Sequence, residues 1–235
     1  MRVNDIDART FKAKQLTVEV QPPSTAVKYD WNDGDLKPNA YKTEEKAGTL
    51  KLVMYFVGKD RTEVHRCISD FLSNLNDAAL LDLEGYKGSY YGMKTSAKIV
   101  STLELRKKKL ELEFDGFFID VPIEKELKAE SQEYMTQGSR DAPCVLRMIN
   151  TTDTDQETTV EGLTETGNIV VTVPAGKTLI IDGDTGLITV DGENAFSCVM
   201  ELWEFPKVTH GKITVKRSNT ANVRIIMEYR PMWLV

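Results

Sequence analysis

Few side chains in this sequence could do chemistry, and their spacing does not assemble a reactive site. The chain has 2 histidines. His65 falls on the polar side of a predicted helix and His210 in a Thr-His-Gly turn, so both positions favour a surface or turn residue over a metal ligand or general base. Cys67, Cys144 and Cys198 are widely separated and lack Cys-x-x-Cys spacing. The sequence therefore favours neither a zinc site nor a disulfide framework.

Acidic residues are abundant, but they have no diagnostic spacing. The sequence contains none of the motifs GxGxxG, Walker GKS/T, HExxH or GxSxG, which removes the usual anchors for nucleotide and hydrolase chemistry. Two glycosidase carboxylates on distant strands would escape such a search. The string DGDTG at 182–186 resembles part of a calcium loop but lacks the terminal glutamate, so a tight turn is preferred. We therefore predict a non-enzyme with no catalytic, cofactor-binding or metal-binding residues and no cofactor.

Composition is that of an ordinary folded protein. The 235 residues are 41% hydrophobic and 28% charged, with a net charge of -6, and no apolar run is long enough for a membrane span. Basic and acidic residues balance over 1–128, so the negative excess lies in 129–235. This distribution argues against nucleic-acid binding, which needs a basic surface.

The first half of the chain changes from strand to helix periodicity. Residues 50–58, LKLVMYFVG, alternate with period two, which predicts a strand covered mostly on both faces. After Gly58 the apolar residues fall at helical spacing. This pattern predicts an amphipathic core helix over about 61–76, with Asp60 or Thr62 as its N-cap.

Aromatic residues and glycines interleave at residues 80–92, LLDLEGYKGSYYG. The pattern predicts a strand that enters a tight turn and leaves it as a second strand. We interpret Tyr86, Tyr90 and Tyr91 as packing or subunit-contact residues; an aromatic platform for sugar stacking is the alternative.

A hairpin is predicted over 99–115. The basic string RKKK at 106–109 is interpreted as its solvated tip or as protection of an edge strand, in preference to a nucleic-acid contact. Glu111, Glu113 and Asp115 alternate with apolar residues, so they should form a face that is wet or covered by a partner.

The second half is β throughout. Residues 122–143 are charged and polar with room for one short helix, and the later strings alternate between apolar runs and turn residues. We therefore predict a mainly β fold with one helix: a β-rich domain over 1–128, a linker over 129–143 and a β-sandwich over 144–235.

Several strings, taken in order, resemble the distal tail (Dit) proteins of long-tailed, siphovirus-type bacteriophages and prophages. They are the opening NDIDARTFKAKQLTVEVQPPS, the run from LKLVMYFVG to GSYYG, the string FPKVTHGKITV and the closing YRPMW. Phe205, Pro206 and Gly211 match that family's Phe-Pro…Gly turn. The resemblance covers most of the chain.

The resemblance implies an architecture and a structural role. In that family the first domain forms a closed hexameric ring that joins the tail tube to the tip, and the second is a galectin-like sandwich. The implied partners are further copies of the chain, the tail tube protein, the tail tip or hub protein and a receptor-binding protein, without sequence-specific nucleic acid or membrane insertion. The implied location is the tail tip of the virion, after assembly in the cytoplasm of the bacterial host.

The resemblance also gives individual segments a provisional role. Strand 50–58 and hairpin 99–115 become candidate ring-forming elements, and the acidic face at Glu111, Glu113 and Asp115 a candidate lining for a DNA passage. Two alternatives stay open. One is a sugar-binding adhesin module, with Trp203 or the tyrosines at 86–91 as its platform, and the other is a different tail tube or tip protein.

Overall fold

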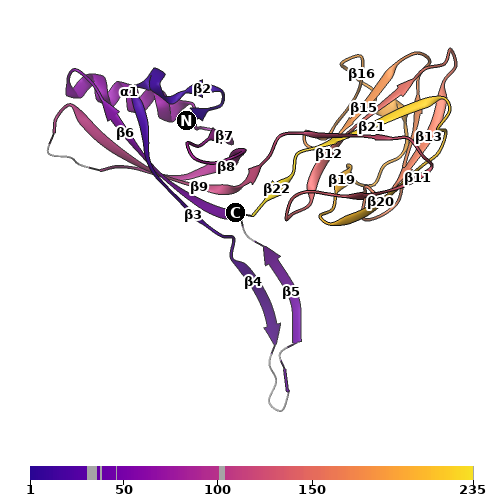
Figure 1. Ribbon diagram of the computed structural model, residues 1–235, viewed down its shortest axis with the longest axis horizontal. Helices are drawn as coiled ribbons and strands as arrows, with labels where there is room; N and C mark the ends of the chain where they lie inside the picture. Colours follow the sequence, from indigo (N-terminus) through magenta and orange to yellow (C-terminus); the bar gives the residue numbers. More distant parts are fainter. Residues whose placement is uncertain (31–35, 38, 46, 101–103, 235) are drawn as a thin grey trace. The chain divides into compact units, whose positions relative to one another are not determined.

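The chain forms two compact units. A computed structural model describes residues 1–30, 36–37, 39–45, 47–100 and 104–234. One unit, here the N-terminal unit, comprises Met1–Ile119 with Leu234–Val235, and the other, the C-terminal unit, comprises Asp120–Trp233 (Figure 1). The division therefore falls between Ile119 and Asp120. It lies before residue 128, where we predicted the first domain to end.

The N-terminal unit is an antiparallel sheet with one α-helix among its described residues. The strand order is β2-β1-β7-β8-β9-β6-β3, and β4 and β5 pair separately with each other. The elements are β1 (Arg2–Val3), β2 (Ile6–Asp7), η1 (Ala8–Phe11), β3 (Ala13–Gln21), β4 (Thr25–Asp30), β5 (Asn39–Glu45), β6 (Gly48–Val57), α1 (Arg61–Ser73), β7 (Ala79–Asp82), β8 (Ser89–Val100) and β9 (Lys107–Ile119).

The predicted strand and helix are both present in this unit. From Gly48 to Phe56 the residues of β6 alternate between buried and partly buried, because successive side chains point to opposite faces of a strand. Asp60 is the N-cap of α1. Its carboxylate accepts the backbone N–H of Glu63 at 2.8 Å, which satisfies a donor that the first turn leaves free. The helix lies on the sheet through its buried face, where the Phe71 ring meets those of Phe11 and Phe56 edge-on.

Two glycines make room for a buried tyrosine in the hairpin of β8 and β9. Gly92 and Gly116 face each other across the two strands, and a side chain on Gly116 would collide with the carbonyl oxygen of Tyr91. The buried Tyr90 donates its hydroxyl hydrogen bond to the carbonyl of Gly48 at 3.0 Å. Gly92, one of the glycines that we predicted to mark a turn, and Gly116 therefore permit close packing within the sheet.

The C-terminal unit is a sandwich of two antiparallel sheets. Their strand orders are β10-β21-β12-β15-β16-β17, with β19 beside β12, and β11-β20-β13-β14-β18. The elements are β10 (Ile123–Leu127), β11 (Ser131–Met135), β12 (Ala142–Asn150), β13 (Gln156–Glu161), β14 (Ile169–Val173), β15 (Thr178–Asp182), β16 (Leu187–Val190), β17 (Glu193–Asn194), η2 (Phe196–Cys198), β18 (Val199–Glu201), β19 (Lys207–Val208), β20 (Lys212–Arg217), β21 (Val223–Tyr229) and β22 (Met232–Trp233).

The linker that we predicted over 129–143 is part of this sandwich. β11 pairs with β20 along five residues, from Ser131↔Lys216 to Met135↔Lys212, and the preceding β10 pairs with β21. Both are edge strands with a polar outer face, so they have too few apolar residues to show a strand pattern in the sequence. The short helix considered for this segment is wrong.

Two tight turns shape the hairpin β15-β16-β17 as predicted. Asp191 and Gly192 have φ of 53° and 85°, the positive values that a two-residue hairpin turn with right-handed strand twist requires. In the preceding turn, Gly186 has φ of 70°. The predicted fold class, mainly β with a single α-helix and a C-terminal sandwich, is confirmed.

Candidate functional site

The two histidines lie at the surface. His65 is exposed on α1, and His210 Nδ1 lies 3.2 Å from the Asp141 carboxylate, with both side chains largely exposed. No nucleophile completes a triad at this pair in the contacts of the described residues. The pair fastens a surface turn, because the backbone N–H of His210 donates to the same carboxylate at 3.1 Å.

The residues considered for metal binding and the three cysteines occupy turns and packed positions instead of a reactive site. Among the residues that the structure describes, no group of three or more His, Cys, Asp or Glu could hold a metal ion. In the string DGDTG, the Asp182 carboxylate accepts the backbone N–H groups of Asp184 and Thr185 at 2.8 and 3.2 Å, which makes it a turn residue. The three cysteines are free, and burial raises the pKa of the Cys144 thiol.

The tyrosines at 86–91 do not present three rings to solvent. Tyr90 is buried, and its ring meets that of Phe118 edge-on at 5.1 Å. Tyr86 also stacks on the Phe118 ring, with the two ring centroids 5.4 Å apart. Tyr91 lies beside Phe117. These contacts favour the packing interpretation over a sugar platform.

Trp203 is the most exposed aromatic side chain that the structure describes, at 76%. Its indole N–H donates to the Glu201 carboxylate at 3.1 Å, and the ring covers Gly167, where a Cβ would meet it. Phe196 and Met200 nearby in the sequence are also exposed. The tryptophan is therefore held in one orientation while its other surface stays open.

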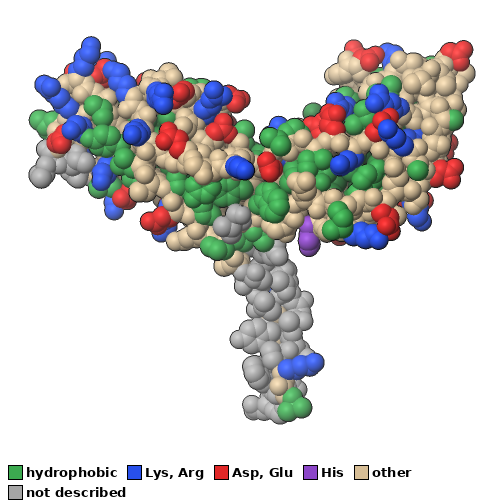
Figure 2. All heavy atoms as spheres, in the orientation of Figure 1, with side chains coloured by type: hydrophobic (Ala, Val, Ile, Leu, Met, Phe, Trp, Pro, Cys, Tyr) green, Lys and Arg blue, Asp and Glu red, His purple; other side chains and the backbone are tan. Residues whose placement is uncertain are grey.

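One face of the N-terminal sheet is polar. Leu110, Leu112 and Phe114 of β9 are buried, so Glu111 and Glu113 must point to the opposite face. Glu113 pairs with Lys51 at 3.7 Å and accepts from Ser96 at 3.3 Å. The predicted acidic face thus carries lysines as well, and Figure 2 shows basic and acidic side chains intermixed on the face of the molecule that it displays.

An edge strand also distinguishes the N-terminal unit. β3 ends the order of the sheet and pairs with β6 on one side. It is nine residues long, and Leu16, at an irregularity of its register, is 43% exposed. Long edge strands with an exposed apolar residue are ready to pair with another chain.

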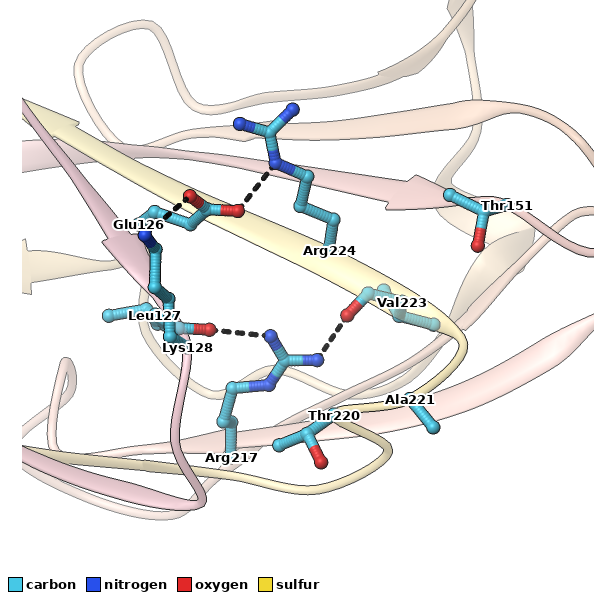
Figure 3. A pocket seen from close by; sticks show the side chains of 9 residues that line it. All are labelled: Glu126, Leu127, Lys128, Thr151, Arg217, Thr220, Ala221, Val223 and Arg224. Carbon is cyan, nitrogen blue, oxygen red and sulfur yellow. Dashed lines mark hydrogen bonds and ion pairs between the residues drawn. The ribbon is translucent and has the colours of Figure 1, made fainter.

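The C-terminal unit contains a pocket of about 370 Å³. It opens where the end of β10 meets the turn between β20 and β21 (Figure 3). Its polar lining includes Glu126, Lys128, Thr151, Arg217, Thr220 and Arg224.

Arg217 is the central side chain of this pocket. It is only 6% exposed, and its guanidinium donates to the carbonyl oxygens of Leu127 at 2.7 Å and Asn219 at 3.0 Å, and to that of Val223. Every hydrogen-bond acceptor found for it among the described residues is a backbone carbonyl. Burial lowers the pKa of Arg217, although an arginine stays protonated in proteins.

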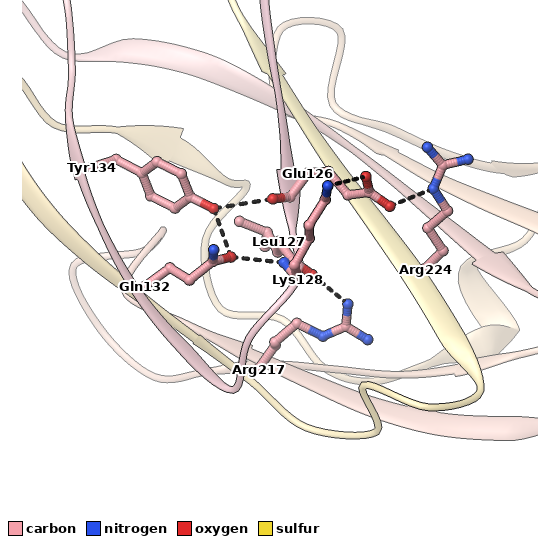
Figure 4. A network of polar contacts seen from close by, with 7 residues as sticks. All are labelled: Glu126, Leu127, Lys128, Gln132, Tyr134, Arg217 and Arg224. Carbon is pink, nitrogen blue, oxygen red and sulfur yellow. Dashed lines mark hydrogen bonds and ion pairs between the residues drawn. The ribbon is translucent and has the colours of Figure 1, made fainter.

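A polar network fixes the opposite wall of the pocket (Figure 4). Glu126 accepts from Arg224 Nε at 2.6 Å and lies 3.7 Å from Lys128 Nζ. Gln132 accepts the backbone N–H of Lys128 at 2.7 Å and the Tyr134 hydroxyl at 2.8 Å. These bonds hold the connection between β10 and β11 in one conformation.

The alternation of residues along β20 is a sequence signal that points to Arg217. In β20 the residues alternate between exposed and buried, and Ile213, Val215 and Arg217 share the buried face. A charged residue at an inward position is rarely buried without partners. The pocket itself had no signal, since β10 is distant in the chain from β20 and β21.

Comparison with known proteins identifies the C-terminal unit. Residues 137–233 match the family model SPP1_Dit, the siphovirus-type tail component, C-terminal domain. The C-terminal unit is therefore similar to the C-terminal domain of the siphovirus-type (Dit) tail components. No curated protein matches the sequence. The predicted resemblance to the Dit proteins is confirmed for this part of the chain.

Solved structures share the fold of this chain over nearly its whole length. The Dit protein (gp 19.1) of phage SPP1, a paradigm of the hub adsorption apparatus in phages that infect Gram-positive bacteria, has a TM-score of 0.72 at 12% identity and covers 98% of this chain and 97% of its own. Chains of the phage P2 baseplate in its activated conformation, with Ca and with Sr, have TM-scores of 0.58 and 0.57 at 10% identity, covering 94% of this chain and 92% of their own.

Proposed function

We propose that this chain is a Dit protein and forms the structural hub of a tail tip, where its N-terminal units assemble into a ring and its C-terminal units dock other tail components. The observation that carries the proposal is the shared fold with the SPP1 hub protein over 98% of the chain. The role is assembly and binding, and no residue is assigned to catalysis. The proposed location is the tail tip of the virion, after assembly in the cytoplasm of the bacterial host.

The exposed edge and polar face support self-association through the N-terminal unit. β3 offers an unpaired edge, and the face of β6 and β9 opposite α1 carries both signs of charge. A ring closes through interfaces in which each copy presents two different surfaces to its neighbours. Mixed charges let equal copies approach, so the unit suits a closed ring. If the ring forms, the face bearing Glu111, Glu113 and Asp115 is the candidate lining for a DNA passage.

The C-terminal sandwich is suited to docking. Its two sheets already cover each other, with a continuous core between them, so its fold needs no second copy. We propose that it binds the tail tip protein or a receptor-binding protein, while the ring binds the tail tube.

The test is the absolute mass of the purified protein by light scattering over a concentration series. A closed hexamer is expected, and Leu16→Lys on β3 should lower the mass because it places a charge in the proposed interface. Leu187→Lys is the matched control, since Leu187 is also exposed but lies in the C-terminal unit. A strict monomer at every concentration would contradict self-assembly, and an equal effect of both variants would contradict the assignment to β3.

Trp203 supports a second candidate function, binding of a neutral sugar. A fixed and exposed tryptophan ring is a surface on which a sugar ring can stack, and Glu201 and Glu204 supply hydrogen-bond acceptors beside it in the sequence. Glycan-array binding that Trp203→Ala abolishes would support this function. Binding that persists in the variant would exclude Trp203 as the platform.

A further inference from the structure

We propose that the pocket beside Arg217 in the C-terminal unit binds a phosphate group. This site is independent of the ring and of the sugar candidate at Trp203. Its lining comes from the end of β10, the end of β20 with the turn after it, the start of β21, and Thr151, which follows β12. Four observations carry the proposal: the charge of the lining, the state of Arg217, the free donors of Arg224 and the rigidity of the walls.

The pocket is locally cationic within an acidic unit. Arg217, Arg224 and Lys128 line it with a single carboxylate, that of Glu126, which leaves a formal excess of two positive charges. A phosphomonoester carries about -1.5 to -2 charges at neutral pH, whereas a diester or a carboxylate carries about -1. The charge of the lining therefore matches a phosphomonoester or inorganic phosphate best.

Arg217 supplies a buried positive charge without a carboxylate bonded to it. Four of its N–H groups donate to backbone carbonyls, from Nε to Ser218 and from the two terminal nitrogens to Leu127, Asn219 and Val223. A guanidinium has five donors, so one N–H on Nη1 has no acceptor among the described residues. The carbonyls fix the orientation of the group but do not neutralise it, and an anion in the pocket would.

Arg224 supplies donors from the opposite wall. Its Nε donates to Glu126 at 2.6 Å, and no partner is found for its two terminal nitrogens among the residues that the structure describes. Figure 3 shows these nitrogens directed away from both Glu126 and Arg217, and the side chain is exposed, so it is free to turn toward an anion. Arginine binds phosphate oxygens in pairs through such parallel N–H groups, and the hydroxyl of Thr220 on the lining offers a further donor, whereas that of Thr151 donates to the carbonyl of Asn222 at 3.2 Å.

The walls of the pocket are held before any ligand binds. The turn after β20 is anchored where Asn219 and Asn222 both donate to the Gln156 amide oxygen at 3.0 Å. The opposite wall is fixed by the network of Glu126, Gln132 and Tyr134. A preorganised site loses little conformational entropy on binding, and a volume of about 370 Å³ lies at the small end of ligand sites.

The experiment is isothermal titration calorimetry of the full chain at constant ionic strength. Inorganic phosphate and glycerol 3-phosphate represent the free anion and a sugar-alcohol monoester, glycerophosphocholine a phosphodiester, and acetate the carboxylate. We expect inorganic phosphate and glycerol 3-phosphate to bind saturably at one site per chain. The phosphodiester and acetate should bind more weakly, and glycerol, the uncharged control, should not bind. If inorganic phosphate binds and glycerol 3-phosphate does not, the ligand is the free ion.

Two variants test the location of the site. Arg224→Gln and Lys128→Gln should each weaken phosphate binding, Arg224→Gln by about tenfold to a hundredfold, since a hydrogen bond to a charged group contributes about 1.5–3 kcal/mol. Lys212→Gln is the matched control, because Lys212 is an exposed lysine at the other end of β20, paired with Glu133. Thermal unfolding checks that each variant stays folded. Arg217 is left intact, as it also holds the turn together.

Three outcomes would overturn the proposal. Heats that do not saturate with any phosphate would exclude a site. An equal loss of affinity in Arg224→Gln and Lys212→Gln would show diffuse attraction to the surface. Equal affinity for phosphate and acetate would show an anion site without the selectivity that we assign to it. None of these results depends on the oligomeric state, so they are distinguishable from a failure of the ring.

Discussion

The two units of this protein cover the apolar faces of their sheets in different ways. In the C-terminal unit two sheets cover each other, and buried residues from both meet in one core. In the N-terminal unit one helix covers one face of a single sheet, while residues on the opposite face, such as Lys51 and Glu113, remain partly exposed and paired by charge. A sheet with one open face and a free edge is suited to a neighbouring copy, and a closed sandwich is suited to carrying sites on its loops and edges.

The largest expected effect is in the core of the N-terminal unit. Phe71→Ala should lower the free energy of unfolding of that unit by about 3–5 kcal/mol, because it removes a buried ring and leaves a cavity. Chemical denaturation of the full chain, followed by a probe in each unit, measures it. Leu16→Ala on the exposed edge is the control and should change little. A similar loss in both units would mean that they unfold together.

The buried arginine makes the corresponding test in the C-terminal unit. Arg217→Met should destabilise the sandwich by about 2–3 kcal/mol, since unsatisfied buried acceptors such as the carbonyls of Leu127 and Val223 cost about 1–3 kcal/mol. Thermal unfolding checks this value against Lys216→Met, the exposed neighbour on β20. A variant as stable as the control would show that water replaces the guanidinium.

The cap of the only α-helix that the structure describes offers a smaller effect. Asp60→Ala should destabilise the N-terminal unit by about 1 kcal/mol, because the bond to the Glu63 N–H is lost. Asp70→Ala is the matched control, since Asp70 is exposed near the other end of α1. Equal losses in the two variants, measured by urea denaturation, would indicate a general charge effect.

The smallest effect concerns the pH response of the pocket wall. The hydrogen bond from Arg224 lowers the pKa of the Glu126 carboxyl below its ordinary value of 4.5. A lowered pKa in the folded state means that the pairing stabilises the protein above pH 4.5, and that this stabilisation disappears as the pH falls through the lowered pKa. Carbon-detected NMR titration should show the pKa of Glu126 rising in Arg224→Gln and unchanged in Lys212→Gln. A pKa that does not move would contradict the role of Arg224.

Much of the fold could be predicted from local patterns. Strand β6, helix α1 with Asp60 as its cap, and the turn at Asp191 and Gly192 each follow from short-range spacing or from the φ that a residue can adopt. The edge strands β10 and β11 could not be predicted in this way. They are strands because β21 and β20 pair with them, and the free energy of that pairing does not appear in their own composition.

The sequence by itself determined the fold class, the resemblance to the Dit proteins and the scarcity of groups that could catalyse a reaction. These properties depend on periodicity, turn residues and composition, all of which are local or additive along the chain. Only the tertiary structure decided that Tyr90 is buried while Trp203 is exposed, and that Arg217 meets Arg224 and Lys128 around one pocket. The physical reason is that burial and electrostatic environment depend on which distant strands become neighbours, and sequence spacing does not fix those pairings.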